Sequence, residues 1–73
     1  MDQAAAEFAI KALMAQVRAR INDADGIVKA AKACIEAGNP DKGIEIALDM
    51  EQPLYEASRL LDAASLIKRI SRT

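Results

Sequence analysis

The sequence has no histidine and no tryptophan, and only one cysteine, one phenylalanine and one tyrosine among its 73 residues. Without histidine the chain can form neither a histidine-ligated metal site nor an imidazole general base. A single cysteine allows neither an intramolecular disulfide nor a zinc site made of several thiolates. The three glycines, at positions 26, 38 and 43, match no nucleotide-binding loop. We therefore expect a protein that is not an enzyme and that holds no metal or other cofactor.

Long apolar runs and an excess of charge of one sign are also missing. No stretch approaches the ~18 consecutive apolar residues of a transmembrane helix, and the N-terminus lacks the basic and apolar regions of a signal peptide. The formal net charge is −1, which gives no broad electrostatic attraction to nucleic acid. The lone Cys34 suits a reducing compartment. We expect a cytoplasmic protein with no membrane span, in which apolar neighbours bury Cys34.

What the sequence does contain is an excess of apolar residues in a helical pattern. Hydrophobic residues make up 52% of the chain. One apolar seam advances by alternating steps of four and three, which is the heptad spacing of a helix face that packs on another helix. Its members are Ile10, Met14, Val17, Ile21, Ala24, Val28, Ala31 and Ile35. The seam predicts one long helix over about residues 3–37, continuous through Gly26.

A second seam, made mostly of small residues, follows the same rhythm on another side of this helix. Its members are Ala5, Ala9, Ala12, Gln16, Ala19, Asp23, Gly26, Ala30, Ala33 and Ala37. An ordinary surface helix has one apolar stripe for one core, so a helix with two seams needs neighbours on two sides. The small-residue seam either packs within the hairpin described below or forms a second contact with a partner.

A tight turn between two helices is predicted where Gly38, Asn39 and Pro40 follow one another. Glycine suits the left-handed residue that closes a helix, asparagine suits the next N-cap, and proline suits the first helical position. So short a turn returns the second helix antiparallel to the first, with residue i opposite residue 78 − i. We expect this helix over about residues 40–71. A kink is expected near Pro53, because proline lacks an N–H and crowds the preceding turn.

The expected fold is all-α. It is an antiparallel helical hairpin, a single domain over residues 1–73, with a long helix (about 3–37), a turn (38–40) and a proline-kinked helix (about 40–71). Two helices cannot enclose the apolar surface of both seams, so we expect a homo-oligomer, with a dimer that forms a four-helix bundle favoured. The alternative is a three-helix monomer in which the segment after Pro53 folds back. The residues expected at the self-association face are Ile10, Met14, Val17, Ile21, Val28, Ile35, Leu60, Leu61 and Ile67.

This pattern favours a small protein–protein interaction or scaffolding module, such as an adaptor, a chaperone-like subunit or a regulator, with a heterologous protein as a further candidate partner. Two charged features support alternatives. Basic residues gather toward the terminal end of the hairpin, and they are Lys11, Arg18, Arg20, Lys68, Arg69 and Arg72. They would form the phosphate-binding patch of a nucleic-acid-binding regulator, although no aromatic residue accompanies them to stack on bases.

The second charged feature is an acidic stripe on the second helix. Its main members are Glu45, Asp49 and Glu56. Acidic residues four apart repel one another weakly on an isolated helix. The stripe is either a solvated surface, partly neutralised by Lys29 and Lys32 from the first helix, or a functional surface. In the second case it is a docking site for a basic partner or a weak carboxylate site for a cation.

Two short resemblances accompany the turn. Ala37–Gly38–Asn39 followed by Gly43–Ile44–Glu45 is similar to the turn between the helices of a tetratricopeptide repeat, over about ten residues and without a second copy. A short hairpin with Asn39–Pro40–Asp41 at its tip resembles type III secretion needle subunits, although the second proline of their turn is missing. The latter resemblance implies a third alternative, a secretion-apparatus or filament subunit. Neither resemblance carries functional residues to this chain.

The first seam makes one prediction that needs no structure. Replacing Val17 and Ile21 together by aspartate should convert the assembly to a poorly folded monomer, because both positions would place charge on the apolar seam. Circular dichroism and light scattering measure the two effects. A double variant that is well folded and monomeric would show that the seam is not the interface it is expected to be.

Overall fold

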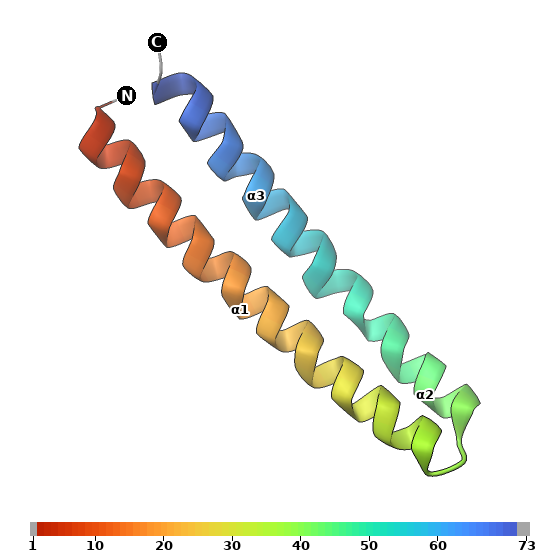
Figure 1. Ribbon diagram of the computed structural model, residues 1–73. Coiled ribbons are helices and arrows are strands. Elements are labelled where there is room, and N and C mark those ends of the chain that lie inside the picture. Colours follow the sequence, from red (N-terminus) through yellow and green to blue (C-terminus); the bar gives the residue numbers. More distant parts are fainter. Residues whose placement is uncertain (1, 72–73) are drawn as a thin grey trace.

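Residues 2–71, which the computed structural model describes, form two long helical arms joined by a tight turn (Figure 1). Helix α1 (Gln3–Glu36) is the first arm. Helix α2 (Pro40–Ala47), the 3-10 turn η1 (Leu48–Met50) and helix α3 (Glu51–Ser71) follow end to end as the second arm. The arms run antiparallel along a rod that measures 55 by 14 by 11 Å between its outermost Cα atoms. This is the all-α hairpin that the sequence predicts.

Helix α1 begins at a capping residue and continues without interruption. The Asp2 side chain accepts a hydrogen bond from the backbone N–H of Ala5 at 3.2 Å, which satisfies one of the four N–H groups that a helix start leaves unpaired. The helix passes through Gly26, as the apolar pattern predicts. The cost of a glycine, about 1 kcal/mol relative to alanine, does not break the helix there.

The turn closes α1 with a pair of backbone hydrogen bonds. The N–H of Asn39 donates to the carbonyl of Cys34 at 2.9 Å, and the N–H of Gly38 donates to that of Ile35 at 3.0 Å. This pair defines a Schellman motif, which needs a left-handed residue, and Gly38 supplies it with φ of 92°. Pro40 then occupies the first turn of α2. Asn39 precedes the helix as predicted, but its side chain makes no capping hydrogen bond.

The second arm is kinked one turn before Pro53. Proline has no N–H to offer the carbonyl of Asp49, and its ring crowds that carbonyl. The chain responds by tightening to the 3-10 turn Leu48–Met50 before the α-helix resumes at Glu51. Helix α3 then continues alongside α1 (Figure 1). The three-helix alternative, in which this segment folds back on itself, is therefore wrong.

The two arms meet along an inner seam that advances by alternating steps of three and four on each of them. On α1 its members are Ala6, Ile10, Leu13, Val17, Arg20, Ala24, Ile27, Ala31 and Cys34. On the second arm they are Gly43, Ile46, Met50, Pro53, Ala57, Leu60, Ala64, Ile67 and Ser71. All are buried or half-buried, and the rhythm continues across η1, so the kink does not rotate the packing surface.

Only small residues and one proline are fully buried in this seam. Ala6, Ala24, Ala31, Ala57 and Ala64 form the apolar core, and the seam also buries Gly43 and Pro53. No large side chain is fully buried among the described residues. The larger members of the seam, and Cys34, are half-buried, so the expectation of a buried Cys34 thiol is only partly met.

Gly43 marks the tightest contact between the arms. A Cβ added there would clash with the side chain of Ile35 and would lie 2.8 Å from the carbonyl oxygen of Ala31. A Cβ added at Gly26 would find no atom within 4 Å. Gly43 thus lets the two arms approach closely. Gly26 lies on the exposed surface of α1 and makes no contact with the second arm.

These two glycines allow a matched pair of substitutions. Gly43→Ala should lower the free energy of unfolding by roughly 1 kcal/mol, because overpacking strain of about 1–3 kcal/mol exceeds the helix-propensity gain of about 1 kcal/mol. Gly26→Ala should raise it by about 1 kcal/mol, since it brings only the propensity gain. Urea unfolding followed by circular dichroism gives both values, and equal effects of the two substitutions would contradict the packing at Gly43.

Candidate functional site

A row of exposed apolar side chains runs along α1 beside the inner seam. Met14, Ile21, Val28 and Ile35 are between 38% and 47% exposed. Each comes four residues after a member of the inner seam, so all four lie on the same side of that seam. They are half of the apolar seam that the sequence predicts.

The second arm carries a matching row. Leu54 and Leu61 follow inner-seam residues by four positions and are 46% and 56% exposed. Ile44 lies beside this row near the turn and is 57% exposed. Continuing the rows by seven residues reaches Glu7 on α1 and Lys68 on α3, and these two line one hollow at the terminal end. The two rows therefore lie on the same side of the hairpin.

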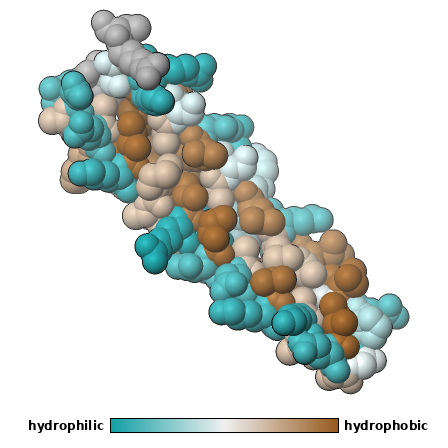
Figure 2. All heavy atoms as spheres, in the orientation of Figure 1, coloured by the Kyte–Doolittle hydropathy of each residue, from teal (hydrophilic) through white to brown (hydrophobic). Residues whose placement is uncertain are grey.

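We call this surface the apolar face. Its members are Met14, Ile21, Val28, Ile35, Ile44, Leu54 and Leu61. Figure 2 shows a band of apolar side chains running along the length of the molecule, with polar side chains along its edges. A monomeric protein seldom exposes an apolar patch that is this continuous, and such patches mark sites of interaction.

The opposite side of the hairpin carries a cluster of polar side chains beside exposed apolar residues such as Leu66. There the Nε of Arg20 lies 3.1 Å from a carboxylate oxygen of Glu56, and its Nη1 lies 3.7 Å from a carboxylate oxygen of Asp23. The side-chain amide of Gln52 donates a hydrogen bond to Glu56 at 3.0 Å. Arg20 takes a position in the inner seam, and its guanidinium reaches out of the seam to these partners. The ion pair between Arg20 and Glu56 also shows the register of the two arms. The predicted register sets Glu56 opposite position 22, two residues from Arg20.

The residues predicted for self-association divide between two surfaces. Ile10, Val17, Leu60 and Ile67 are half-buried in the inner seam, where they join the two arms of one chain. Met14, Ile21, Val28, Ile35 and Leu61 lie on the apolar face. The sequence-based prediction missed Leu54 and Ile44. Leu54 could have been found because it precedes Leu61 by seven residues, and the helical spacing of the second arm is not interrupted at Pro53.

The small-residue seam does not pack within the hairpin. Ala9 and Ala19 are half-buried, and the other members are exposed. Of the two alternatives for this seam, packing inside the hairpin is therefore wrong. The other alternative, a contact with a partner, stays a prediction.

The predicted basic patch is spread over different sides of the hairpin. Lys11, Arg18 and Arg69 are exposed, and Lys68 lies at the terminal end of the apolar face. Arg20 lies on the side opposite the apolar face, where it is paired with Glu56 and Asp23. Arg72 lies outside the described residues.

The acidic stripe is only partly paired. Glu56 is held by Arg20, and Glu45 lies 3.6 Å from the amine of Lys42. Asp49 is exposed. Lys29 does not neutralise the stripe but lies 2.9 Å from Asp25 one turn earlier on α1. The hydrogen bond to Asp25, together with the negative charge of that carboxylate, raises the pKa of Lys29.

Residues 2–71 contain neither a metal-binding cluster nor a membrane-spanning helix. No cluster of three or more cysteine or carboxylate side chains in this range is arranged to hold a metal ion. No helix in it combines the length and the apolar character that crossing a lipid bilayer requires.

Comparisons of the chain with models of known protein families, with curated proteins and with solved structures find no match.

Because Val17 lies in the inner seam and Ile21 lies on the apolar face, aspartate at these two positions should have different effects on folding. Val17→Asp should unfold much of the hairpin, because it puts an unpaired charge between the two arms, at a cost of roughly 2–3 kcal/mol or more. Ile21→Asp should leave the helical content within about a tenth of that of the wild type, since surface substitutions usually change stability by no more than about 0.5 kcal/mol. Circular dichroism of dilute protein compares the two, and equal loss of helix would contradict this division.

Proposed function

We propose that the chain is a small non-enzymatic interaction or scaffolding module that self-associates through its apolar face, so that two hairpins form a four-helix bundle. The observation that carries this proposal is the apolar face, whose seven large apolar side chains are 38–57% exposed on one side of the hairpin. Buried against a second hairpin, these side chains become the central layer of a bundle.

The energetics of a single hairpin also support the proposal. Its apolar core consists of five alanines, and small chains bury too little apolar surface to be more than marginally stable alone. Completing the burial of side chains that are half-exposed contributes about 1 kcal/mol each. Seven such residues on each of two copies offer a substantial part of the stability that a small domain needs.

The dimensions of the hairpin suit such an interface. A face 55 Å long and 14 Å wide has an area of about 770 Å², close to the ~800 Å² per partner that specific protein interfaces of standard size bury. Adaptor, chaperone-like subunit and regulator are the roles that fit a self-associating module of this kind, and the cytoplasm is the compartment we propose for it.

The two alternatives have less support. A nucleic-acid-binding role would use Lys11, Arg18, Lys68 and Arg69, but the charge of Arg20 is already neutralised by Glu56 and Asp23. A filament subunit would need two different surfaces that fit each other without closing. The exposed small-residue seam on α1 is the one surface besides the apolar face that supports this alternative.

Light scattering and sedimentation at several concentrations test the proposal. The wild type should approach twice the mass of the chain as concentration rises. Leu61→Asp should weaken this association by about a hundredfold or more, because each copy would bury a carboxylate in the interface. The matched control is Leu66→Asp. Leu66 is similarly exposed (49%) but lies about 140° around the helix from Leu61, so its substitution should leave the association unchanged.

Two results would contradict the proposal. One is a wild type that stays monomeric at every concentration, and the other is equal weakening by Leu61→Asp and Leu66→Asp. A mass that grows without limit would favour the filament alternative. Retention on RNA or DNA that is lost as salt rises would favour the nucleic-acid alternative.

A further inference from the structure

The apolar face is not the same at its two ends. At the terminal end its two rows finish in opposite charges, Glu7 on α1 and Lys68 on α3, which line one hollow together with Ala6 and Ile10. At the turn end the rows finish in Ile35 and Ile44, which are 43% and 57% exposed. An occupant of this face must therefore meet one negative and one positive charge at one end and aliphatic side chains at the other.

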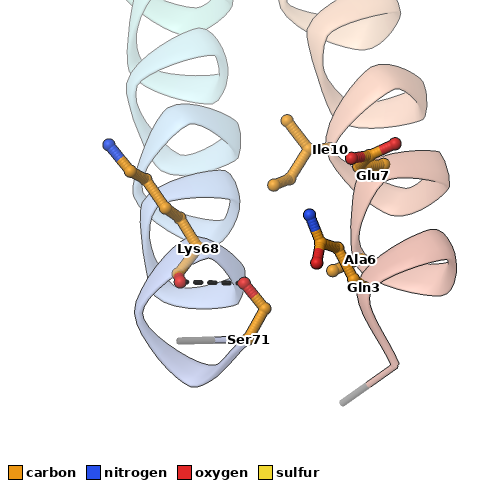
Figure 3. Close-up of a pocket in the computed structure, with 6 residues that line it drawn as sticks. All are labelled: Gln3, Ala6, Glu7, Ile10, Lys68 and Ser71. Atoms are coloured by element: carbon orange, nitrogen blue, oxygen red, sulfur yellow. Dashed lines mark hydrogen bonds between the residues drawn. The ribbon is translucent and has the colours of Figure 1, made fainter. Parts of the chain in front are cut away.

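Glu7 and Lys68 do not satisfy each other within one chain. Figure 3 shows that the amine of Lys68 extends away from the hollow and that the carboxylate of Glu7 lies on the other helix, beside Ile10. No ion pair joins either of them to another described residue. Both charges are free to meet a partner that covers the apolar face.

A second copy can cover this face in two symmetric ways. If the two-fold axis lies across the helices, the terminal end of one copy meets the turn end of the other. That arrangement presses Glu7 and Lys68 against Ile35 and Ile44 of the second copy, and charges buried against aliphatic side chains without partners are costly. In that arrangement Lys32 of the second copy, three residues before Ile35, could reach Glu7, and Lys68 would still lack a partner.

If the two-fold axis runs parallel to the helices, equal levels of the two copies meet, and α1 of each copy lies over α3 of the other. Glu7 then faces Lys68 of the second copy. A two-fold interface repeats every contact, so Lys68 also faces the second copy's Glu7. Along the rest of the face, Met14 meets Leu61 and Ile21 meets Leu54, since these pairs follow the charged pair by successive steps of seven residues.

We infer that two copies of this chain pack with their terminal ends together, and that reciprocal pairs between Glu7 of one copy and Lys68 of the other set this alignment. The inference rests on the proposed function and adds to it the direction and register of the dimer. The apolar side chains supply most of the affinity. The charges discriminate against the reversed arrangement, because only the ends-together dimer gives both of them a partner.

A charge exchange between two variants tests the alignment. Glu7→Lys alone sets lysine against Lys68 twice, and Lys68→Glu alone sets glutamate against Glu7 twice. Each homodimer should be weaker than the wild type by about tenfold at low salt. An equimolar mixture of the two variants should recover nearly wild-type affinity, since both interchain pairs become attractive in the mixed dimer. The recovery should shrink at ~1 M salt, where the screening length is about 3 Å.

The matched control exchanges the same charges on the outward side of the hairpin. Glu36→Lys and Arg69→Glu change exposed residues away from the apolar face, so neither these variants nor their mixture should alter the association. Circular dichroism checks that all four variants remain helical. An equimolar mixture of Glu7→Lys and Lys68→Glu that is no tighter than either variant alone, beside a wild type that dimerises, overturns the alignment and leaves the proposed function standing. A monomeric wild type overturns both.

A distance measurement gives a second readout that does not depend on charge variants. A spin label on Ala4→Cys, in a Cys34→Ala background, marks the terminal end of each copy. In the ends-together dimer the two labels should lie much closer together than the 55 Å length of the hairpin. A label separation close to that length would overturn the inference.

Discussion

The structure depends on the close approach of two helices through small residues. Ala6, Ala24 and Ala31 on α1 face a second arm that places alanine, glycine or proline at most of the buried positions. At Gly43 the backbone of one arm comes so near the other that a single added carbon would collide with it. Helices this close leave no room for large side chains between them, so leucine, isoleucine and methionine residues lie at the edges of the contact and beyond it.

This packing explains why the two sides of the hairpin differ. On one side the inner seam is edged by Glu56, Asp23 and the guanidinium of Arg20, which satisfy one another at the surface. On the other side it is edged by aliphatic residues such as Ile21 and Leu61, which are 47% and 56% exposed. This difference between the two sides is the physical basis for the self-association that we propose.

Charge then acts on arrangement more than on stability. Ion pairs at exposed positions each contribute at most about 1 kcal/mol, and the pairs within this chain are of that kind. Charges in an interface act differently. A charge that an alignment places against aliphatic side chains loses its hydration and gains no partner, so that alignment is disfavoured. Glu7 and Lys68 lie at one end of an otherwise aliphatic surface, where a small number of charges can select one alignment of two copies over another.

The sequence by itself determined the features that depend on neighbouring residues. The cap at Asp2, the left-handed glycine at the turn, the restart at Pro40 and the distortion before Pro53 all follow from backbone geometry and hydrogen bonding within a few residues. For the same reason the all-α hairpin and its approximate register were predictable. These interactions are complete within a turn or two of helix and need no distant partner.

Only the tertiary structure decided which of two overlapping seven-residue patterns faces inward. The two patterns share Ile10, Val17, Ala24 and Ala31. The predicted seam continues through Met14 and Ile21, whereas the arms pack through Leu13 and Arg20. Hydrophobicity alone favours the first pattern, since Arg20 is charged. Packing selects the second. Ala24 and Ala31, which both patterns share, keep the arms close, as at Gly43, and the long side chain of Arg20 reaches solvent from the edge of the inner seam. That choice depends on the shapes of two surfaces far apart in the chain, and it leaves the larger aliphatic residues as the exposed face.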